Sequence, residues 1–451
     1  MLEPFRWLRL KPFGISGAAL FDWRSHTSVV SEWSLNASGN VIASSRRDIL
    51  TQSQPRGDHN IGKVAFNPNL SPGDPDYGNM YISFGDGGNY RSPSAGGSDT
   101  TLSPNGQDTT NFLGAMLRID SLQGGSDPYT VPADNPFGGQ AGILDEIWAY
   151  GLRNLHQFSW DRGGNGDMLI ADIGQRNIEE VNIGVQGANY GWSVREGTFD
   201  MTGKAPDNPI AADVLPANHP SDSYTYPVTQ YDHDADNTGQ NNAAIAGGFV
   251  YRGTQVAELR GKYIFGNFGT FGRFGKPDDF QDIYAVDVDQ LQLRDDFSDL
   301  ASLSDVFLAP LQKLSLVDSS GDPIQLLDLV RQKSGNNSQT RADMRFGIDA
   351  EGEIYVTSKK DGTIRCFIGT PLPDYDFDGD IDGADFLDWQ HTDGSPDGLS
   401  DWQNQYGSGS PGGQDGTVVP EPKSVALLLA ALAIHARTLG RSERVSPGKP
   451  K

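Results

Sequence analysis

The segment 66–88, "FNPNLSPGDPDYGNMYISFGDGG", decides the fold, because its pattern returns twice further along the chain. The later copies are "FSWDRGGNGDMLIADIGQ" at 158–175 and "FGIDAEGEIYVTSKKDG" at 346–362. Each copy runs from an aromatic strand end through a polar turn with glycine into a short apolar strand, which is the pattern of a β-hairpin. A related strand, "GKYIFGNF", begins at Gly261. The chain is therefore expected to be built from antiparallel hairpins.

The spacing of these copies indicates a repeated unit. Their first residues, Phe66, Phe158 and Phe346, are 92 and 188 positions apart, close to two and four units of about 46 residues, a length typical of propeller blades. Coincidence is the alternative, since only three good copies are present. We predict an all-β domain over residues 1–369, with short helices in the leucine-rich stretches 287–316 and 323–333.

Composition restricts the classes of partner. The 451 residues include 35 lysines and arginines against 59 aspartates and glutamates, a formal net charge of -24. Such a charge repels phosphate backbones and anionic lipids, so nucleic acid is not an expected partner. Cys366 is the only cysteine, so no internal disulfide can form. The first 23 residues contain no apolar run long enough for a secretory signal or a membrane span.

His59 lies in "GDHNIGKVAF", residues 57–66, directly before a strand-like run. An imidazole titrates near neutral pH and can accept a proton from an alcohol if a neighbour fixes its tautomer. Asp58 is a candidate for that neighbour or for a substrate contact. The alternative is a structural turn residue, which is the commoner role of a histidine before a strand.

A second loop, "YGLRNLHQFSWD" at 150–161, places Arg153 and Asn154 before the next strand. Arginine in such a loop can hold a carboxylate through two parallel hydrogen bonds or stabilise an oxyanion. The alternative role is a hydrogen bond between neighbouring blades.

A third loop, "ADIGQRNIEEVN" at 171–182, combines a Gly-Gln turn with Glu179, Glu180 and Asn182. Main-chain carbonyls with carboxylates nearby are the hard oxygen ligands that Ca²⁺ prefers. A solvated turn with surface glutamates is the alternative.

In this order, the three loops and the strands around them resemble the glucose/sorbosone dehydrogenase family, the quinoprotein aldose dehydrogenases. The resemblance extends from about residue 28 to residue 367. It rests on "DHNIGKVAF…YISFGDGG", "FLGAMLRID", "ADNPF", "EIWAYGLRN", "ADIGQRNIEEVN", "GANYGW", "AGGFVYRG", "LRGKYIFGNF" and "FGIDAEGEIYV".

This resemblance implies a six-bladed β-propeller that holds pyrroloquinoline quinone (PQQ) and Ca²⁺ over the mouth of its central channel. It implies that His59 is the general base, which takes the proton from a sugar hydroxyl while hydride passes to the quinone. Asp58, beside it, matches a substrate contact.

The same resemblance implies the cofactor contacts. Arg153 and Asn154 match residues that contact the quinone and stabilise its charge after reduction, and Arg252 in "VYRG" matches a further cofactor-binding cation. The carbonyls of Gly174 and Gln175 match the Ca²⁺ ligands. A metal in that position would polarise a quinone carbonyl as a Lewis acid.

Two features depart from the family pattern. Relatives usually read Arg-Asn-Pro, then an aromatic residue and an arginine, where this chain continues with Leu155, His156 and Gln157. His156 is a candidate cofactor contact or, alternatively, a polar strand residue. Relatives also have a longer segment before the histidine loop, so the resemblance implies a truncated first blade.

The carboxyl-terminal part contains a separate metal-binding pattern, "DYDFDGDIDGAD" at 374–385. Its spacing is the Ca²⁺ loop of an EF-hand, and with the short helix expected over "FLDWQ" the segment 370–407 resembles a dockerin repeat. A second copy, "DGLSDWQNQYG", has lost most ligands, so a Ca²⁺-stabilised spacer is expected rather than docking. The expected ligands are Asp374, Asp376, Asp378, Asp380, Asp382 and Asp385.

Residues 408–419 read as a flexible Gly/Ser-rich linker. Residues 420–451 place Pro-Glu-Pro before a mostly apolar run and then arginines, which resembles the PEP-CTERM sorting signal of exopolysaccharide-producing bacteria. The apolar run is shorter than the roughly 20 residues of a membrane span, so a loosely ordered amphipathic end is the alternative. The tail implies export to the cell surface or the exterior, in association with surface material.

The expected function is an exported, Ca²⁺-dependent quinoprotein that oxidises sugar hydroxyls and passes electrons to an unidentified acceptor. One rival is a non-catalytic propeller that binds surface glycans or proteins. Another is a Ca²⁺-dependent propeller lactonase, which should need a carboxylate-rich central metal cage.

Overall fold

The computed structural model describes part of the chain. The described residues are 7–10, 25–88, 103–122, 126–175, 178–201, 224–232, 244–268, 282–293, 308–317, 323–367, 375, 381–392 and 394–406. The chain divides into two compact units, Met1–Pro371 and Leu372–Lys451.

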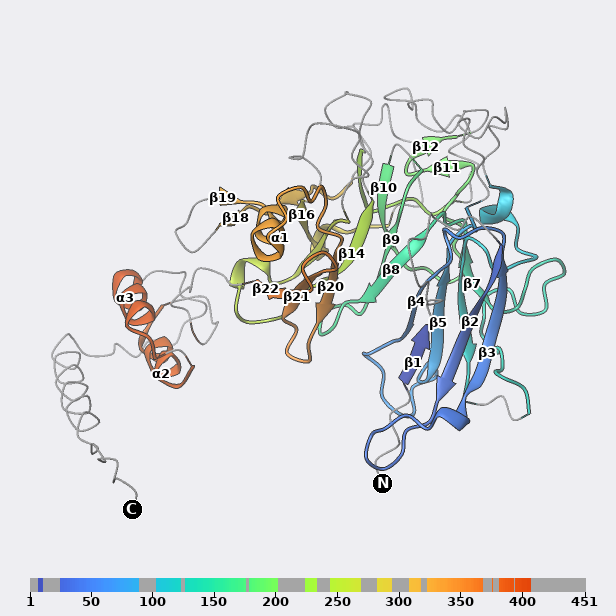
Figure 1. Cartoon of the computed structure of the whole chain (residues 1–451), viewed down its shortest axis with the longest axis horizontal. Helices are drawn as coiled ribbons and strands as arrows, with labels where there is room; N and C mark the ends of the chain where they lie inside the picture. The colour runs from blue at the N-terminus through green and yellow to red at the C-terminus, as the bar shows by residue number, and fades with distance from the viewer. Residues whose placement is uncertain are drawn as a thin grey trace, which may run out of the picture. The chain divides into compact units, whose positions relative to one another are not determined.

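Five antiparallel sheets of three or four strands follow one another along the described part of the first unit (Figure 1). The first contains β1 (Trp7–Leu10), β2 (His26–Trp33) and β3 (Arg47–Gln54). The second contains β4 (Ile61–Phe66), β5 (Asn79–Phe84), β6 (Ala115–Asp120) and β7 (Ile147–Tyr150). The third contains β8 (Leu155–Trp160), β9 (Met168–Asp172), β10 (Ile178–Ile183) and β13 (Thr229–Asp232).

The fourth sheet contains β14 (Ile245–Val250), β15 (Lys262–Asn267), β16 (Ile283–Asp287) and β17 (Gln312–Lys313). The fifth contains β20 (Met344–Ile348), β21 (Ile354–Ser358) and β22 (Ile364–Cys366). Two ribbons add β11 (Arg195–Glu196) with β12 (Phe199–Asp200), and β18 (Leu316–Val317) with β19 (Pro323–Ile324).

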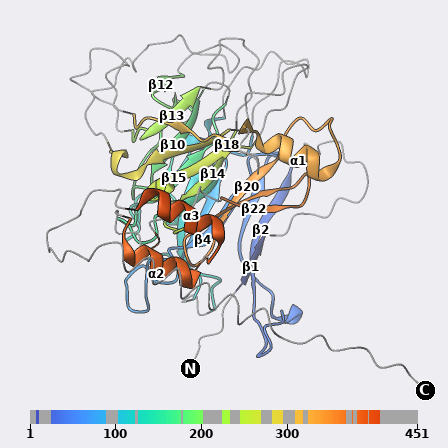
Figure 2. The same ribbon diagram turned by 90° about the vertical axis from the view of Figure 1, so that its left-hand side faces the viewer.

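The last four sheets share one arrangement, in which the first strand of each sheet forms an edge and packs beside the first strand of the next. Thus β4 contacts β8, β8 contacts β14, and β14 contacts β20. Figures 1 and 2 show these sheets succeeding one another in chain order. This is the blade pattern of a propeller, so the predicted all-β, propeller-type fold is confirmed; the number of six blades stays a prediction.

The three hairpins on which the prediction rests are all present. Residues 66–88 lead from β4 into β5, residues 158–175 from β8 into β9, and residues 346–362 from β20 into β21. Every residue of β5 and of β10 is buried, which explains why these strands read as continuous apolar or mixed runs without alternation.

Aromatic packing between neighbouring sheets fixes their positions. Tyr81 of β5 lies edge-to-face against Trp148 of β7 and Trp160 of β8, with ring centroids 5.5 and 5.2 Å apart. Such pairs contribute about 0.5–1.5 kcal/mol each beyond the burial of their area. The first sheet joins the second through Leu50, which shares an apolar cluster with Ile82. The site described below is therefore carried by a rigid framework.

The helix prediction is confirmed in one stretch, and in the other it stays a prediction for residues 294–307, which lie outside the described residues. Helix α1 (Leu326–Ser334) buries Leu327 and Val330 and ends at Gly335, whose φ of +65° suits a left-handed cap. In the described parts of 287–316 the chain forms a 3₁₀ turn (Val288–Gln290) and short strands but no α-helix, because these residues complete the fourth sheet and start a hairpin.

The second unit contains α2 (Gly383–Thr392) and α3 (Pro396–Gln405), which pack through Phe386, Trp389 and Trp402. The fully buried Asp385 carboxylate accepts backbone N–H bonds from Tyr375 and Asp382, at 2.5 and 2.7 Å. The other predicted loop ligands, the linker and the tail lie outside the described residues: Asp374, Asp376, Asp378, Asp380 and 407–451. No helix in the described ranges is long and apolar enough to cross a membrane.

Candidate active site

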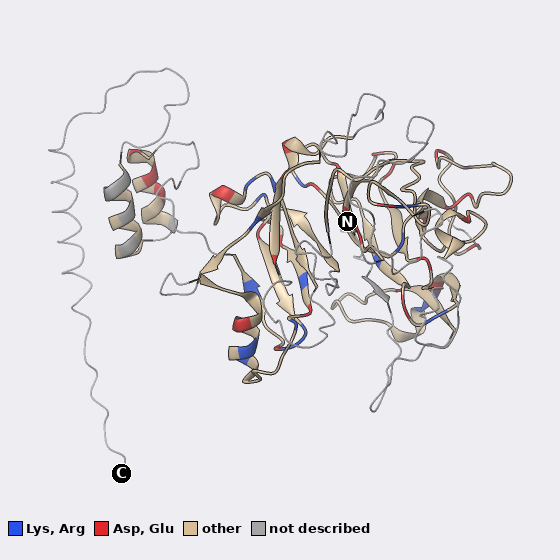
Figure 3. Cartoon of the chain, turned by 90° about the horizontal axis from the view of Figure 1, so that it is seen from above, with Lys and Arg blue, Asp and Glu red and all other residues tan. Residues whose placement is uncertain are grey.

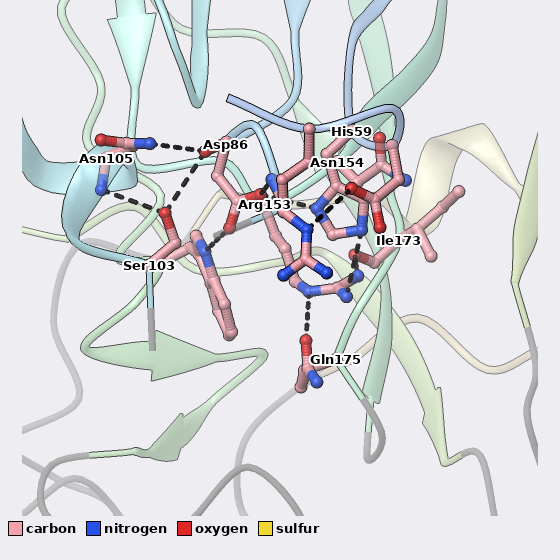
Figure 4. Close-up of polar contacts among 12 residues, drawn as sticks. His59, Asp86, Ser103, Asn105, Arg153, Asn154, Ile173 and Gln175 are labelled. Atoms are coloured by element: carbon pink, nitrogen blue, oxygen red, sulfur yellow. Dashed lines mark hydrogen bonds and ion pairs between the residues drawn. The ribbon is translucent and has the colours of Figure 1, made fainter. Parts of the chain in front are cut away.

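His59 lies in the loop that leads into β4, and its ring is held by an aspartate from the neighbouring strand connection. Nδ1 of His59 lies 2.6 Å from Oδ1 of Asp86, which follows β5 in "SFGDGG" (Figure 4). The two loops meet closely, because a side chain at Gly85 would collide with the backbone of His59. His59 has a φ of +51°, a left-handed conformation that is rare for residues other than glycine and that often marks functional sites.

Asp86 is buried and fully engaged. Its Oδ2 accepts a hydrogen bond from Nε1 of Trp192 at 2.9 Å, and its Oδ1 also accepts from the backbone N–H of Gly88 at 2.9 Å. Burial alone raises the pKa of the Asp86 carboxyl, but the adjacent His59 and Arg153 outweigh it and hold that pKa below its usual range. An ionised Asp86 accepts the Nδ1 proton of His59, which leaves the lone pair on Nε2.

Arg153 brings a guanidinium to that lone pair. Its Nη2 lies 3.3 Å from Nε2 of His59, and its Nε donates to Oε1 of Gln175 at 2.9 Å (Figure 4). Nη1 donates to the carbonyls of Ile173 and Gly174, at 2.8 and 2.5 Å. The guanidinium also lies over the ring of Trp192, 5.5 Å from the centroid. The His59 loop, residues 173–175 after β9 and Trp192 therefore converge on one buried cation.

A buried aspartate fixes the loop that carries Arg153. The Asp172 carboxylate accepts the backbone N–H groups of Arg153 and Asn154, at 2.8 and 2.7 Å. In the β9–β10 ladder Asp172 lies directly opposite Glu180, which is also buried. Burial raises the pKa of Asp172 to about 7 and that of Glu180 to about 8, and each carboxylate disfavours ionisation of its neighbours.

Three residues of this site were missed in the sequence: Asp86, Asp172 and Trp192. Each lies in a short glycine-containing turn segment: Asp86 in "FGDGG", Asp172 in "ADIGQ" and Trp192 in "NYGW". Glycine next to a functional side chain allows close backbone approach, and that signal identifies Asp86 in hindsight. Asp172 and Trp192 act through partners distant in sequence, which the segments do not reveal.

The predicted site residues divide into two groups. His59, Arg153, Asn154, Gly174 and Gln175 lie together, and Asp58 adjoins them with a half-exposed carboxylate near Gly88. Arg252 does not join this group. It follows β14 and binds Asp161 through two hydrogen bonds of 2.8 and 2.6 Å.

Because Asp161 follows β8 whereas Arg153 precedes it, the two arginines lie beyond opposite ends of that strand, whose 6 residues span about 20 Å at 3.3 Å per residue. The predicted cofactor role of Arg252 is therefore not supported by its position.

The Arg153 guanidinium competes with a metal ion for the oxygens of Gly174 and Gln175. The Gly174 carbonyl and the Gln175 side chain both accept hydrogen bonds from Arg153, so a divalent ion there would lie beside a guanidinium. Among the residues that the structure describes, no group of three or more His, Cys, Asp or Glu side chains could hold a metal ion.

Comparison with known proteins identifies the family. Residues 22–273, more than half of the chain, match the glucose/sorbosone dehydrogenase family. The chain belongs to that family. HIPL2 protein of Arabidopsis thaliana is 31% identical over 258 residues, 53% of this chain and 34% of the relative. Quinoprotein glucose dehydrogenase B of Acinetobacter calcoaceticus is 28% identical over 171 residues, 37% of this chain and 32% of the relative.

The chain thus spans about a third of the length of the curated relatives it matches. A solved structure of soluble aldose sugar dehydrogenase from Escherichia coli in the apo form is 18% identical, with a TM-score of 0.45, and covers 80% of this chain and 76% of that one. The sequence match over residues 22–273 is the basis for assigning the chain to this family.

Proposed function

We propose that this family member is a quinoprotein sugar dehydrogenase in which His59 is the general base. The observation that supports the proposal most directly is the pairing of His59 with the buried Asp86, which leaves Nε2 as a proton acceptor at the side of Arg153. A turn histidine needs neither a buried carboxylate nor a strained backbone.

The proton step follows from this geometry. A sugar hydroxyl that replaces Nη2 of Arg153 as the donor to Nε2 of His59 loses its proton to the imidazole, and the resulting imidazolium is stabilised by Asp86. Trp192 and Gly88 hold Asp86 in place, so the histidine keeps one tautomer and one orientation. Arg153 lies where it can stabilise negative charge that develops near the base.

The residues present fit a planar, anionic quinone. Arg153 supplies a positive charge, Asn154 an amide beside it, and Trp192 an aromatic ring under the guanidinium. These side chains would hold PQQ, which supplies the hydride acceptor when bound. The Gly174 carbonyl does not fit Ca²⁺ in this arrangement, because it already accepts a hydrogen bond from the Arg153 guanidinium.

The test is reconstitution of the full chain with PQQ, with and without Ca²⁺, followed by dye reduction with a panel of aldoses. We expect PQQ binding at micromolar concentration or tighter and dye reduction with at least one sugar. Absence of PQQ binding would contradict the proposal. Ester hydrolysis without PQQ would favour the lactonase, and glycan binding without turnover would favour the non-catalytic propeller.

A further inference from the structure

Two cations beside the inner strands of the sheets have no acidic partner. The inner strands are β4, β8, β14 and β20, the first strands of the last four sheets. Lys63 lies on β4, and Arg162 follows β8 by two residues. Neither side chain forms an ion pair with an acidic residue in the part of the chain that the structure describes. Figure 3 shows acidic and basic residues interspersed along the described ribbon, and the net charge is -24, so acids are not scarce.

The Lys63 ammonium reaches across three sheets through contacts that bring no negative charge. Its Nζ donates to the carbonyl of Phe158 at 2.6 Å and lies 5.4 and 5.2 Å from the ring centroids of Phe158 and Phe249. Phe158 belongs to β8 and Phe249 to β14. A carbonyl and two ring faces attract a cation, but they leave its charge without a counter-charge.

Arg162 brings a second positive charge close to the first. Its Nη1 donates to the carbonyl of Asp349, directly after β20, at 3.1 Å. Burial, together with the positive charge of Arg162, lowers the pKa of Lys63 to about 8. The ammonium form therefore still prevails at pH 7, and the two cations repel each other.

The acidic residues next to Arg162 are engaged elsewhere. Asp161 accepts two hydrogen bonds from Arg252, at 2.8 and 2.6 Å. The Asp349 carboxylate accepts one hydrogen bond from a backbone N–H and one from a tyrosine hydroxyl, both at 2.8 Å. Neither carboxylate can neutralise the two cations without losing its own partners. Because charges removed from water are normally paired, the arrangement indicates a counter-ion from solution.

We propose that Lys63 and Arg162 together bind one halide ion, of the class of chloride. An ammonium and a guanidinium supply N–H donors and balance a single negative charge. Sulfate or phosphate would bring four oxygens and a larger charge against the carbonyls of Phe158 and Asp349, which already accept from these cations. The phenyl rings of Phe158 and Phe249 offer such oxygens no hydrogen bond.

This site is separate from the candidate active site. Phe158 is five residues beyond Arg153 along β8, about 16 Å at 3.3 Å per residue. Its contacts come from four sheets, through Lys63, Phe158, Phe249 and the carbonyl of Asp349. A bound halide would therefore connect the inner strands of four neighbouring sheets and stabilise the folded chain, because it binds the folded state alone.

The first experiment measures thermal unfolding of the full chain at pH 7 in potassium glutamate and in potassium chloride at one ionic strength, so that screening is equal. Glutamate is too bulky for a site that holds one atom. We expect the Tm to rise with chloride concentration to a plateau about 2–4 °C higher. The rise should be lost in Lys63→Met/Arg162→Gln. It should persist in Lys262→Gln, which removes an exposed cation bonded to Gln312.

Equal Tm values of the wild type in the two salts would overturn the proposal, and so would an equal chloride effect in the double variant. A larger rise with phosphate than with chloride, dependent on the same two cations, would overturn the assignment to a halide. If the double variant fails to fold, Arg162→Gln alone should weaken the chloride dependence, since it leaves Lys63 in place.

The second experiment locates the ion directly. Crystals of the full chain soaked in bromide should give an anomalous difference peak between Nζ of Lys63 and the Arg162 guanidinium, and crystals of Lys63→Met should lack it. A peak that remains in Lys63→Met, or bromide found only elsewhere, would overturn the proposal. Neither experiment uses PQQ or a sugar, so its outcome is independent of the proposed dehydrogenase.

Discussion

Arg153 and Arg252 lie at opposite ends of β8 and are held in different ways. Arg252 donates to both carboxylate oxygens of the buried Asp161, so its charge is neutralised within the fold. Arg153 donates to two carbonyls and an amide and forms no ion pair with a described acidic side chain. An arginine held by neutral acceptors keeps its charge for a ligand, whereas one paired with a carboxylate joins two sheets. The family resemblance implied a cofactor-binding role for both arginines.

The largest effect is expected for His59→Ala, at the end of β8 that carries Arg153. Loss of the proton acceptor should lower kcat for dye reduction by about 10²–10⁴-fold, the usual contribution of a general base. PQQ affinity, measured by fluorescence quenching, should stay within a few fold, because Arg153 and Trp192 remain. Retention of turnover in this variant would place the base elsewhere.

Asp86→Asn should have the next largest effect. An asparagine amide can keep a hydrogen bond to the ring but no longer stabilises the imidazolium, and it can favour the wrong tautomer of His59. We expect kcat to fall by about 10²-fold or more, with little change in KM. A matched control is Asp76→Asn, whose carboxylate contacts Tyr81 away from His59. Equal loss of activity in both variants would indicate a general folding defect.

Removing the charge of Arg153 or of Arg252 tests whether the first binds a ligand and the second stabilises the fold. Arg153→Gln should weaken PQQ binding by about tenfold or more. Arg252→Gln should leave PQQ binding unchanged but destabilise the fold by about 2–3 kcal/mol, because the buried Asp161 carboxylate loses its partner. Titration of PQQ and urea unfolding distinguish these outcomes, and Arg252→Gln/Asp161→Asn should recover part of the stability. A weaker PQQ affinity in Arg252→Gln would restore the role inferred from sequence.

The sequence predicted the hairpins and the position of the base because both depend on local patterns. Phe66–Gly88 contains its turn, its strand and the glycines that let Asp86 meet His59 within one short segment. The pairing of Arg252 with Asp161 was not foreseen, because nothing local reveals a partner that lies 91 positions earlier in the chain. The competition between Arg153 and a metal ion at Gly174 likewise depends on a contact across two loops. Local turns were therefore predictable, and pairings between sheets were not.

The smallest effect concerns the buried carboxylates beneath the Arg153 loop. Burial raises the pKa of Asp172 to about 7 and of Glu180 to about 8, so the folded chain binds protons that the unfolded chain has already released. The stability from these groups is complete below their unfolded pKa values, near 4, and is lost as pH rises through 7 and 8.

Measurement between pH 6.5 and 8.5 avoids His156, whose lowered pKa affects stability at lower pH, between about 4 and its usual value of 6.5. Over that window the Tm of the wild type should fall by about 2–4 °C more than that of Glu180→Gln, since one pKa unit corresponds to about 1.4 kcal/mol. The exposed Glu258→Gln should follow the wild type. Identical slopes for all three chains would show that the pKa of Glu180 does not lie in this range, and the Arg153 loop would then rest on ionised carboxylates.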